Sequence, residues 1–289
     1  MDQQIDAGAA CGPEGCDIPA TSAPAPAAAG AGTRIDIVSD AICPWCYIGK
    51  RQLERALADL GGQGLHFSVQ WNPFQLNPDM PPGGVERAAY RAGKFGSAER
   101  AAALDARVSE AARAVGLDFH LDRVLRTPNT IDAHRLIWLA GREGVQDAAM
   151  EAVFAAYFID ARDIGDPAVL EDCAAAAGLD RAAVRRFLAG DDIGEDMRAA
   201  DRAAREAGVS GVPSFFLDGY GLFSGALPAA QMAEALPRAS PLEPFRCFVR
   251  GGACDAGLIQ ETAHVRTRTH SAVDRRQPGD RPCHGAALQ

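Results

Sequence analysis

Residues 33–57 read TRIDIVSDAICPWCYIGKRQLERAL, and they carry two cysteines at the point where a strand pattern changes into a helix pattern. Before the cysteines, Ile35 and Ile37 alternate with polar residues, which predicts a short strand. After them, one helix face is marked by residues at spacings of three and four, namely Cys46, Gly49, Leu53, Ala56, Leu57 and Leu60. The stretch LHFSVQWNPF then predicts a second strand from about His66 to Trp71. Strand, helix and strand in this order build a parallel sheet, so we expect an α/β fold.

The rest of the folded chain divides by its pattern. Residues 85–207 are rich in alanine, arginine and glutamate and repeat helical patterns with almost no strand signal, which predicts a helical domain. Strand character returns in GVPSFFLDG, and PAAQMAEALPRA predicts a closing helix. We therefore expect a split sheet, with halves in residues 34–84 and 208–239 on either side of the inserted helical domain.

Both ends of the sequence predict disorder. Residues 1–33 combine a short head that contains cysteines with the linker PATSAPAPAAAGAG, which can bury too little surface to offset the entropy of ordering it. Residues 240–289 are expected to form a largely disordered C-terminal extension, because its last segment is polar, rich in arginine and aperiodic.

Composition narrows the class of protein. The 289 residues are 47% hydrophobic and 23% charged, as in a soluble globular protein. A net charge of -9 gives no electrostatic reason to expect nucleic acid or an anionic membrane as a partner, so small molecules or proteins are expected instead. The sequence shows neither a secretory signal pattern nor an apolar run long enough to span a bilayer, which predicts a cytoplasmic protein. In the cytoplasm, paired cysteines are more often catalytic, redox-sensing or metal-binding than structural.

The pair Cys43 and Cys46 is predicted to consist of two unequal thiols. Pro44 suits the first helical position, which places Cys43 at the helix cap beside unpaired N–H groups and the positive end of the helix dipole. These groups favour a thiolate at Cys43, while Cys46 lies about one turn further in and is better shielded. Cys43 is thus the predicted attacking thiolate in disulfide exchange and Cys46 the resolving thiol. Trp45 adds bulk without a charge, which limits the stabilisation of the thiolate.

A zinc site is the main alternative from the cysteines themselves. It needs four ligands, usually as two close pairs, and only Cys43 and Cys46 are two residues apart. We therefore predict no metal site and favour a redox pair. Four other cysteines form two more widely spaced pairs, Cys11 with Cys16 and Cys247 with Cys254. One interpretation is that they are auxiliary redox pairs that exchange electrons with Cys43. The alternative is that they are incidental thiols or a metal-chelating head.

A second signal is SGVPSFF at residues 210–216, where a proline opens a strand. We predict a cis peptide bond before Pro213, which would hold the backbone of Val212 open to an extended substrate. His134 lies in a helical pattern and could face the same cleft, although such a histidine is more often packed or hydrogen-bonded within the fold. The predicted substrate-binding residues are Pro44, Trp45, His134 and Val212.

Four ordered motifs, SDAICPWCYIGKRQLE, TPNTIDAHRLI, AYFIDARDIGD with VLEDCAAAAGLD, and GVSGVPSFFLDG, resemble the DsbA-like oxidoreductases of the thioredoxin superfamily, specifically the FrnE-like branch. The resemblance runs from about Ile35 to Leu236. It implies a thioredoxin-like fold with an inserted all-helical domain, with Cys43 and Cys46 as the redox pair and Pro213 as the cis-proline. It also implies thiol–disulfide exchange with protein or small-thiol substrates, and no cofactor unless glutathione serves as co-substrate.

Two related classes supply the alternative function. The 2-hydroxychromene-2-carboxylate isomerases and the kappa-class glutathione transferases resemble the same architecture, but they usually carry serine at the helix cap and act with glutathione. Cysteine at both Cys43 and Cys46 favours redox exchange over that chemistry. A redox sensor without turnover is the third hypothesis, and either a monomer or a homodimer is compatible with the sequence.

Overall fold

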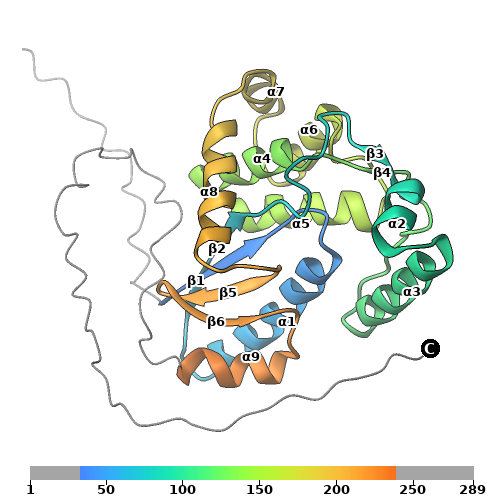
Figure 1. Cartoon of the computed structure of the whole chain (residues 1–289). Coiled ribbons are helices and arrows are strands. Elements are labelled where there is room, and N and C mark those ends of the chain that lie inside the picture. Colours follow the sequence, from blue (N-terminus) through green and yellow to red (C-terminus); the bar gives the residue numbers. More distant parts are fainter. Residues whose placement is uncertain (1–32, 239–289) are drawn as a thin grey trace, which may run out of the picture. The chain divides into compact units, whose positions relative to one another are not determined.

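The computed structural model describes residues 33–238, and the predictions for the head, the linker and the C-terminal extension lie outside these residues (Figure 1). The sheet has four strands in the order β2-β1-β5-β6. The strands are β1 (Thr33–Ser39), β2 (Phe67–Pro73), β5 (Ser214–Leu217) and β6 (Tyr220–Ser224). β1 is parallel to β2 and antiparallel to β5, so the sheet joins strands from both ends of the described chain, as the split pattern predicts.

Strand β2 extends two residues beyond its predicted end, through Pro73. β2 is an edge strand of the sheet, and an edge strand tolerates a proline because its free side needs no backbone N–H.

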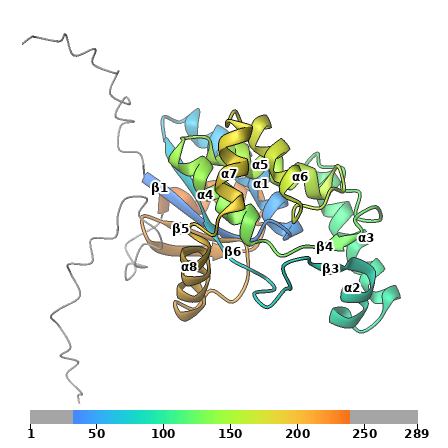
Figure 2. The same ribbon diagram turned by 90° about the horizontal axis from the view of Figure 1, so that it is seen from above.

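The helices fall into two groups. α1 (Pro44–Gly61) and α9 (Ala229–Ala235) belong to the sheet segments and pack against each other (Figure 1). Between β2 and β5, α2 and α3 lie side by side and apart from the sheet (Figure 2). This inserted segment contains α2 (Arg87–Phe95), α3 (Ala98–Ala114), α4 (Ile131–Arg142), α5 (Gln146–Phe158), α6 (Pro167–Ala176), α7 (Arg181–Ala189) and α8 (Gly194–Glu206).

The inserted segment also contains a small two-stranded sheet that the sequence pattern does not reveal. β3 (Val85–Glu86) pairs antiparallel with β4 (Arg126–Thr127). Two residues are too few to produce a period-two pattern, so strands of this length carry no periodic signal.

One continuous core joins the sheet to the inserted helices. Ile37 of β1 and Tyr47 of α1 belong to the same buried cluster as Phe154 and Phe158 of α5. The Tyr47 and Phe154 rings stack with centroids 4.9 Å apart, a contact that adds about 0.5–1.5 kcal/mol to the effect of burial. The inserted helices are therefore packed onto the sheet segment through shared aromatic contacts.

A buried lysine reinforces this junction between α1 and α5. Lys50 is 3% exposed, and its Nζ lies 3.0 Å from Asp147 Oδ2 and 3.1 Å from Glu151 Oε2, with Glu54 as a further partner. The three carboxylate side chains are 32–58% exposed, so they compensate the charge of the buried ammonium group while they remain partly solvated.

A glutamine side chain pairs with the free edge of β2. The Trp71 N–H donates to Gln146 Oε1 at 2.9 Å, and Gln146 Nε2 donates to the Trp71 carbonyl at 3.1 Å. The amide thus makes both bonds that a neighbouring strand would make to Trp71. The N–H and carbonyl groups at an unpaired strand edge need hydrogen-bond partners and can otherwise pair with another chain. The Gln146 side chain supplies such partners to Trp71, at the edge that no strand of the sheet covers.

Candidate functional site

The turn between β1 and α1 positions Cys43 at the helix cap. Cys43 has extended backbone angles (φ -87, ψ 111) and Pro44 occupies the start of α1, as predicted. Asp40, which is 0% exposed, holds this turn: its carbonyl accepts the Cys43 N–H at 3.0 Å and its Oδ2 accepts the Leu76 N–H at 2.6 Å.

The Cys43 thiol lies beside the predicted proline. The Val212–Pro213 peptide bond is cis, which confirms that prediction. Cys43 Sγ donates to the Val212 carbonyl at 3.5 Å. A Cβ atom on Gly49 would lie 3.2 Å from Pro213 Cγ, so glycine at this position of α1 leaves room for the proline loop.

One expectation about Cys43 needs correction. Its side chain makes no hydrogen bond with the N–H groups of the first helical turn. A protonated thiol is a donor, and the Val212 carbonyl is the acceptor that it finds. Cys43 is 4% accessible and lines a cavity.

Cys46 is shielded as predicted. It is 0% exposed, and this burial raises the pKa of its thiol well above the ordinary 9.0, with the adjacent Cys43 thiol adding to the effect. The Ser39 hydroxyl and the Asp40 backbone act in the opposite direction but do not outweigh burial. The two cysteines therefore differ in environment, and only Cys43 opens onto a cavity.

The cavity at Cys43 has a volume of about 370 Å³, and we call it the Cys43 cavity. The structure brings four of the predicted residues together there, because Cys43, Pro44, Trp45 and Val212 all line it. Trp45 is 42% exposed, a high value for a large apolar side chain. The opposite side is formed mainly by α2 and α3, with apolar contributions from Phe95, Leu104 and Val108.

Sequence reasoning missed a cationic face of α2. Arg87, Arg91 and Lys94 line the Cys43 cavity together with Tyr90, and the one carboxylate among the lining residues is Asp105. Asp105 pairs with Arg87 at 2.9 Å and also with Arg91. The spacing of these residues in RAAYRAGK marks one helix face, but the pattern does not reveal that this face lies opposite the cysteines.

The structure does not bring His134 to the Cys43 cavity. The side chain is 3% exposed, and its Nε2 lies 3.0 Å from the Phe74 carbonyl and 3.5 Å from Asp40 Oδ1. This is the packed, hydrogen-bonded arrangement that was the alternative to substrate binding, and it places His134 on a separate cavity.

The remaining predicted residues cannot be compared, because Cys11, Cys16, Cys247 and Cys254 lie outside residues 33–238. Within the described chain, no helix is long and apolar enough to cross a membrane. In the same residues, no three His, Cys, Asp or Glu side chains gather where they could hold a metal ion.

Comparisons with known proteins show the family and the fold of the chain. The DSBA-like thioredoxin domain family matches residues 34–237. The structure of a probable DsbA oxidoreductase from Streptomyces coelicolor is 34% identical, with a TM-score of 0.65 over 78% of this chain and 97% of that one. A 2-hydroxychromene-2-carboxylate isomerase shares the fold at 21% identity, with a TM-score of 0.52 over 71% of this chain and 95% of that one. The uncharacterised protein YwbO of Bacillus subtilis (strain 168) is 26% identical over 184 residues, which are 63% of this chain and 86% of that protein.

Proposed function

The chain belongs to the DSBA-like thioredoxin domain family, and on that premise we propose that it is a thiol–disulfide oxidoreductase with Cys43 and Cys46 as its redox pair. One observation carries the proposal. Cys43 caps α1 and opens onto a cavity beside the carbonyl of Val212, while Cys46 is fully buried in the first turn of the same helix. An accessible thiol with a shielded partner is what disulfide exchange requires.

In the reducing direction, the Cys43 thiolate attacks one sulfur of a substrate disulfide. A mixed disulfide forms between Cys43 and that sulfur, and the other substrate sulfur leaves as a thiolate. Cys46 then loses its proton and attacks Cys43, which releases the second substrate thiolate and leaves a Cys43–Cys46 disulfide. The pair gives up two electrons and the substrate accepts them. The same steps in reverse oxidise a substrate dithiol.

The backbone at Val212 is proposed to align the substrate. Its carbonyl already accepts a hydrogen bond from Cys43, so an extended substrate segment that binds there would lie alongside the reacting sulfur. Trp45, exposed at the edge of the same cavity, offers an apolar contact for either a peptide or a small thiol.

Insulin reduction in the presence of dithiothreitol tests the assignment. Replacing Cys43 with serine should reduce the rate to the uncatalysed background, whereas Cys173→Ser should retain activity, because Cys173 is buried in α6 and does not line the Cys43 cavity. Retained activity in Cys43→Ser would refute the proposal. The assay is best run in a chain whose terminal cysteines are serine, so that only the central pair can react: Cys11, Cys16, Cys247 and Cys254.

Glutathione-dependent isomerisation or transfer is the second candidate, and the cationic face of α2 favours it. Arg87, Arg91 and Lys94 line the cavity with one carboxylate among them, and guanidinium groups bind carboxylates such as the two of glutathione. Calorimetric titration with glutathione and turnover of an aromatic substrate by Cys46→Ser would support this candidate. An active Cys46→Ser enzyme would count against the two-cysteine mechanism, which needs both thiols.

The direction of electron flow follows from the reduction potential of the Cys43–Cys46 pair. For a cytoplasmic reductase we expect a value near that of the cytosolic glutathione pool, about -220 to -320 mV. A much higher potential, measured by equilibration with glutathione buffers, would instead indicate an oxidant.

A further inference from the structure

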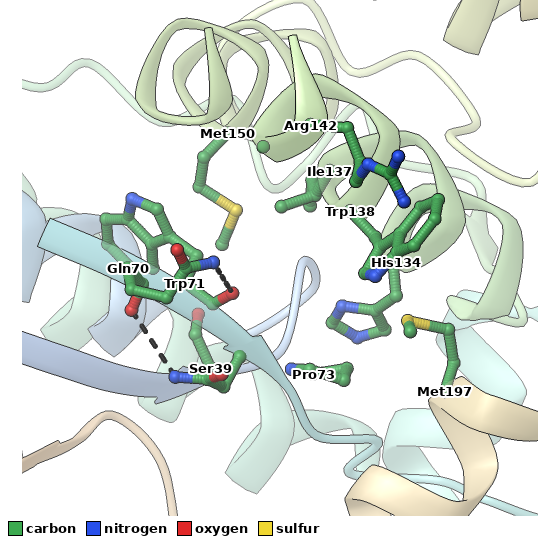
Figure 3. A pocket seen from close by; sticks show the side chains of 12 residues that line it. Ser39, Gln70, Trp71, Pro73, His134, Ile137, Trp138, Arg142, Met150 and Met197 are labelled. Atoms are coloured by element: carbon green, nitrogen blue, oxygen red, sulfur yellow. Dashed lines mark hydrogen bonds between the residues drawn. The ribbon is translucent and has the colours of Figure 1, made fainter. Parts of the chain in front are cut away.

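A second cavity, which we call the rear cavity, lies between β2 and helices α4, α5 and α8 (Figure 3). Its volume is about 270 Å³, slightly below the usual range of ligand pockets, roughly 300–1,000 Å³. It shares no lining residue with the Cys43 cavity. It is therefore a separate site whose size suits a small molecule.

Apolar side chains from three helices form one part of its lining. Ile137 and Trp138 come from α4, Met150 from α5 and Met197 from α8, and Figure 3 shows them around the same space. The two methionines are buried, and methionine adapts its shape readily to a bound apolar group. The lining therefore suits a ligand with an apolar body.

The charge at this cavity is positive. Arg142, at the end of α4, lines it with an exposed side chain, and its guanidinium lies over the Trp138 ring at 5.4 Å. No Asp or Glu lines the cavity, and Arg142 makes no ion pair with any carboxylate of residues 33–238. By contrast, Arg135 of the same helix pairs with Asp132 at 2.8 Å. Arg142 is thus available to an anionic ligand.

Strand β1 supplies one polar residue to the lining. Ser39 lines the rear cavity, but its Oγ is buried, and the hydroxyl acts on the Cys46 thiol, whose pKa it lowers. The hydroxyl is therefore not accessible to a ligand in the cavity, and this part of the lining adjoins Cys46.

We propose that the rear cavity binds a small aromatic monocarboxylate. The carboxylate pairs with Arg142, and the ring packs against Trp138, Met150 and Met197. The proposal rests on the lining of this cavity alone and does not depend on the activity assigned to Cys43.

Methyl NMR of the protein with ¹³C-labelled methionine methyl groups tests it, with 4-hydroxybenzoate as the probe. Met150 and Met197 line the rear cavity and report binding there. Met80 and Met232 do not line it and serve as internal controls. We expect saturable shifts of the first two methyl signals and none of the other two.

The role of the charge is tested by changing the ligand and the arginine separately. Replacing 4-hydroxybenzoate with the neutral 4-hydroxybenzamide, or Arg142 with glutamine, should weaken binding about tenfold, because each change removes the same charge-assisted pair. Arg107→Gln, an exposed arginine on α3 away from the cavity, should leave the affinity unchanged.

Three results would overturn the proposal. The first is the absence of saturable shifts at Met150 and Met197 at millimolar 4-hydroxybenzoate. The second is an equal response of Met80 and Met232, which would indicate unspecific association. The third is an affinity that is unchanged by the amide probe or by Arg142→Gln in a chain whose methyl spectrum is otherwise native.

Discussion

Replacing Gln146 with alanine should destabilise the fold far more than its size suggests. The side chain is 9% exposed and satisfies both the N–H and the carbonyl of Trp71, at 2.9 and 3.1 Å. Alanine would leave the Trp71 N–H without a partner, while the Trp71 carbonyl would keep only the Gln70 side-chain amide, at 3.4 Å. Because a buried unsatisfied group costs about 1–3 kcal/mol, we expect a loss of about 1–3 kcal/mol in the free energy of unfolding. This is a substantial part of the roughly 5–15 kcal/mol that typically holds a protein folded.

Urea unfolding followed by circular dichroism measures this loss. The midpoint should fall while the slope with denaturant stays the same, because the surface exposed on unfolding hardly changes. Gln63→Ala is the matched control: the Gln63 side chain is exposed and, within the described residues, bonds only the Asp59 carbonyl, at 3.2 Å, so its replacement should stay within about 0.5 kcal/mol. If Gln146→Ala lost less than about 1 kcal/mol, or no more than the control, the reasoning about the edge of β2 would be refuted.

Two further predictions follow from the buried ionisable groups. In Cys43→Ser, alkylation of Cys46 by iodoacetamide, followed by mass spectrometry, should still be rising in rate above pH 9.0, because burial raises the pKa of Cys46 well above that value. A plateau below pH 9.0 would contradict this. Burial acts to raise the pKa of Glu151, but the Tyr47 hydroxyl and Lys50 outweigh it and hold the pKa below the ordinary 4.5. Glu151 therefore stabilises the fold above about pH 4.5, and this contribution is lost as the pH falls through the pKa of Glu151 in the folded state. In Glu151→Gln, the free energy of unfolding should therefore change less with pH on the acid side. An unchanged pH dependence of the free energy of unfolding would argue against this role.

The backbone around the cysteines could be predicted because its signals are local. Alternation in β1, the helical spacing after Cys46 and the proline at the first helical position each depend on a few consecutive residues. They correctly placed Cys43 at a helix cap and Cys46 in the shielded first turn. The cis bond before Pro213 could be predicted only by combining two distant motifs.

The surroundings of the cysteines could not be predicted in the same way. The cationic face of α2 is visible as a spacing, but its position opposite Cys43 depends on how α2 and α3 pack. His134 is a second example, because the sequence predicts its helix but not its contacts with Phe74 and Asp40. The pairing of Gln146 with Trp71 likewise joins residues that are distant in sequence and carry no shared pattern.

The sequence by itself determined the strand–helix–strand order around the cysteines, the helical character of the inserted segment and the inequality of Cys43 and Cys46, since periodicity and helix capping act over a few residues. Only the tertiary structure decided that Cys43 opens onto a cavity formed with α2 and α3, and that a second cavity lies between β2, α4, α5 and α8. The physical reason is that a cavity is what remains between packed surfaces. Its shape and charge depend on side chains from several elements at once, and the pattern of no single element contains them.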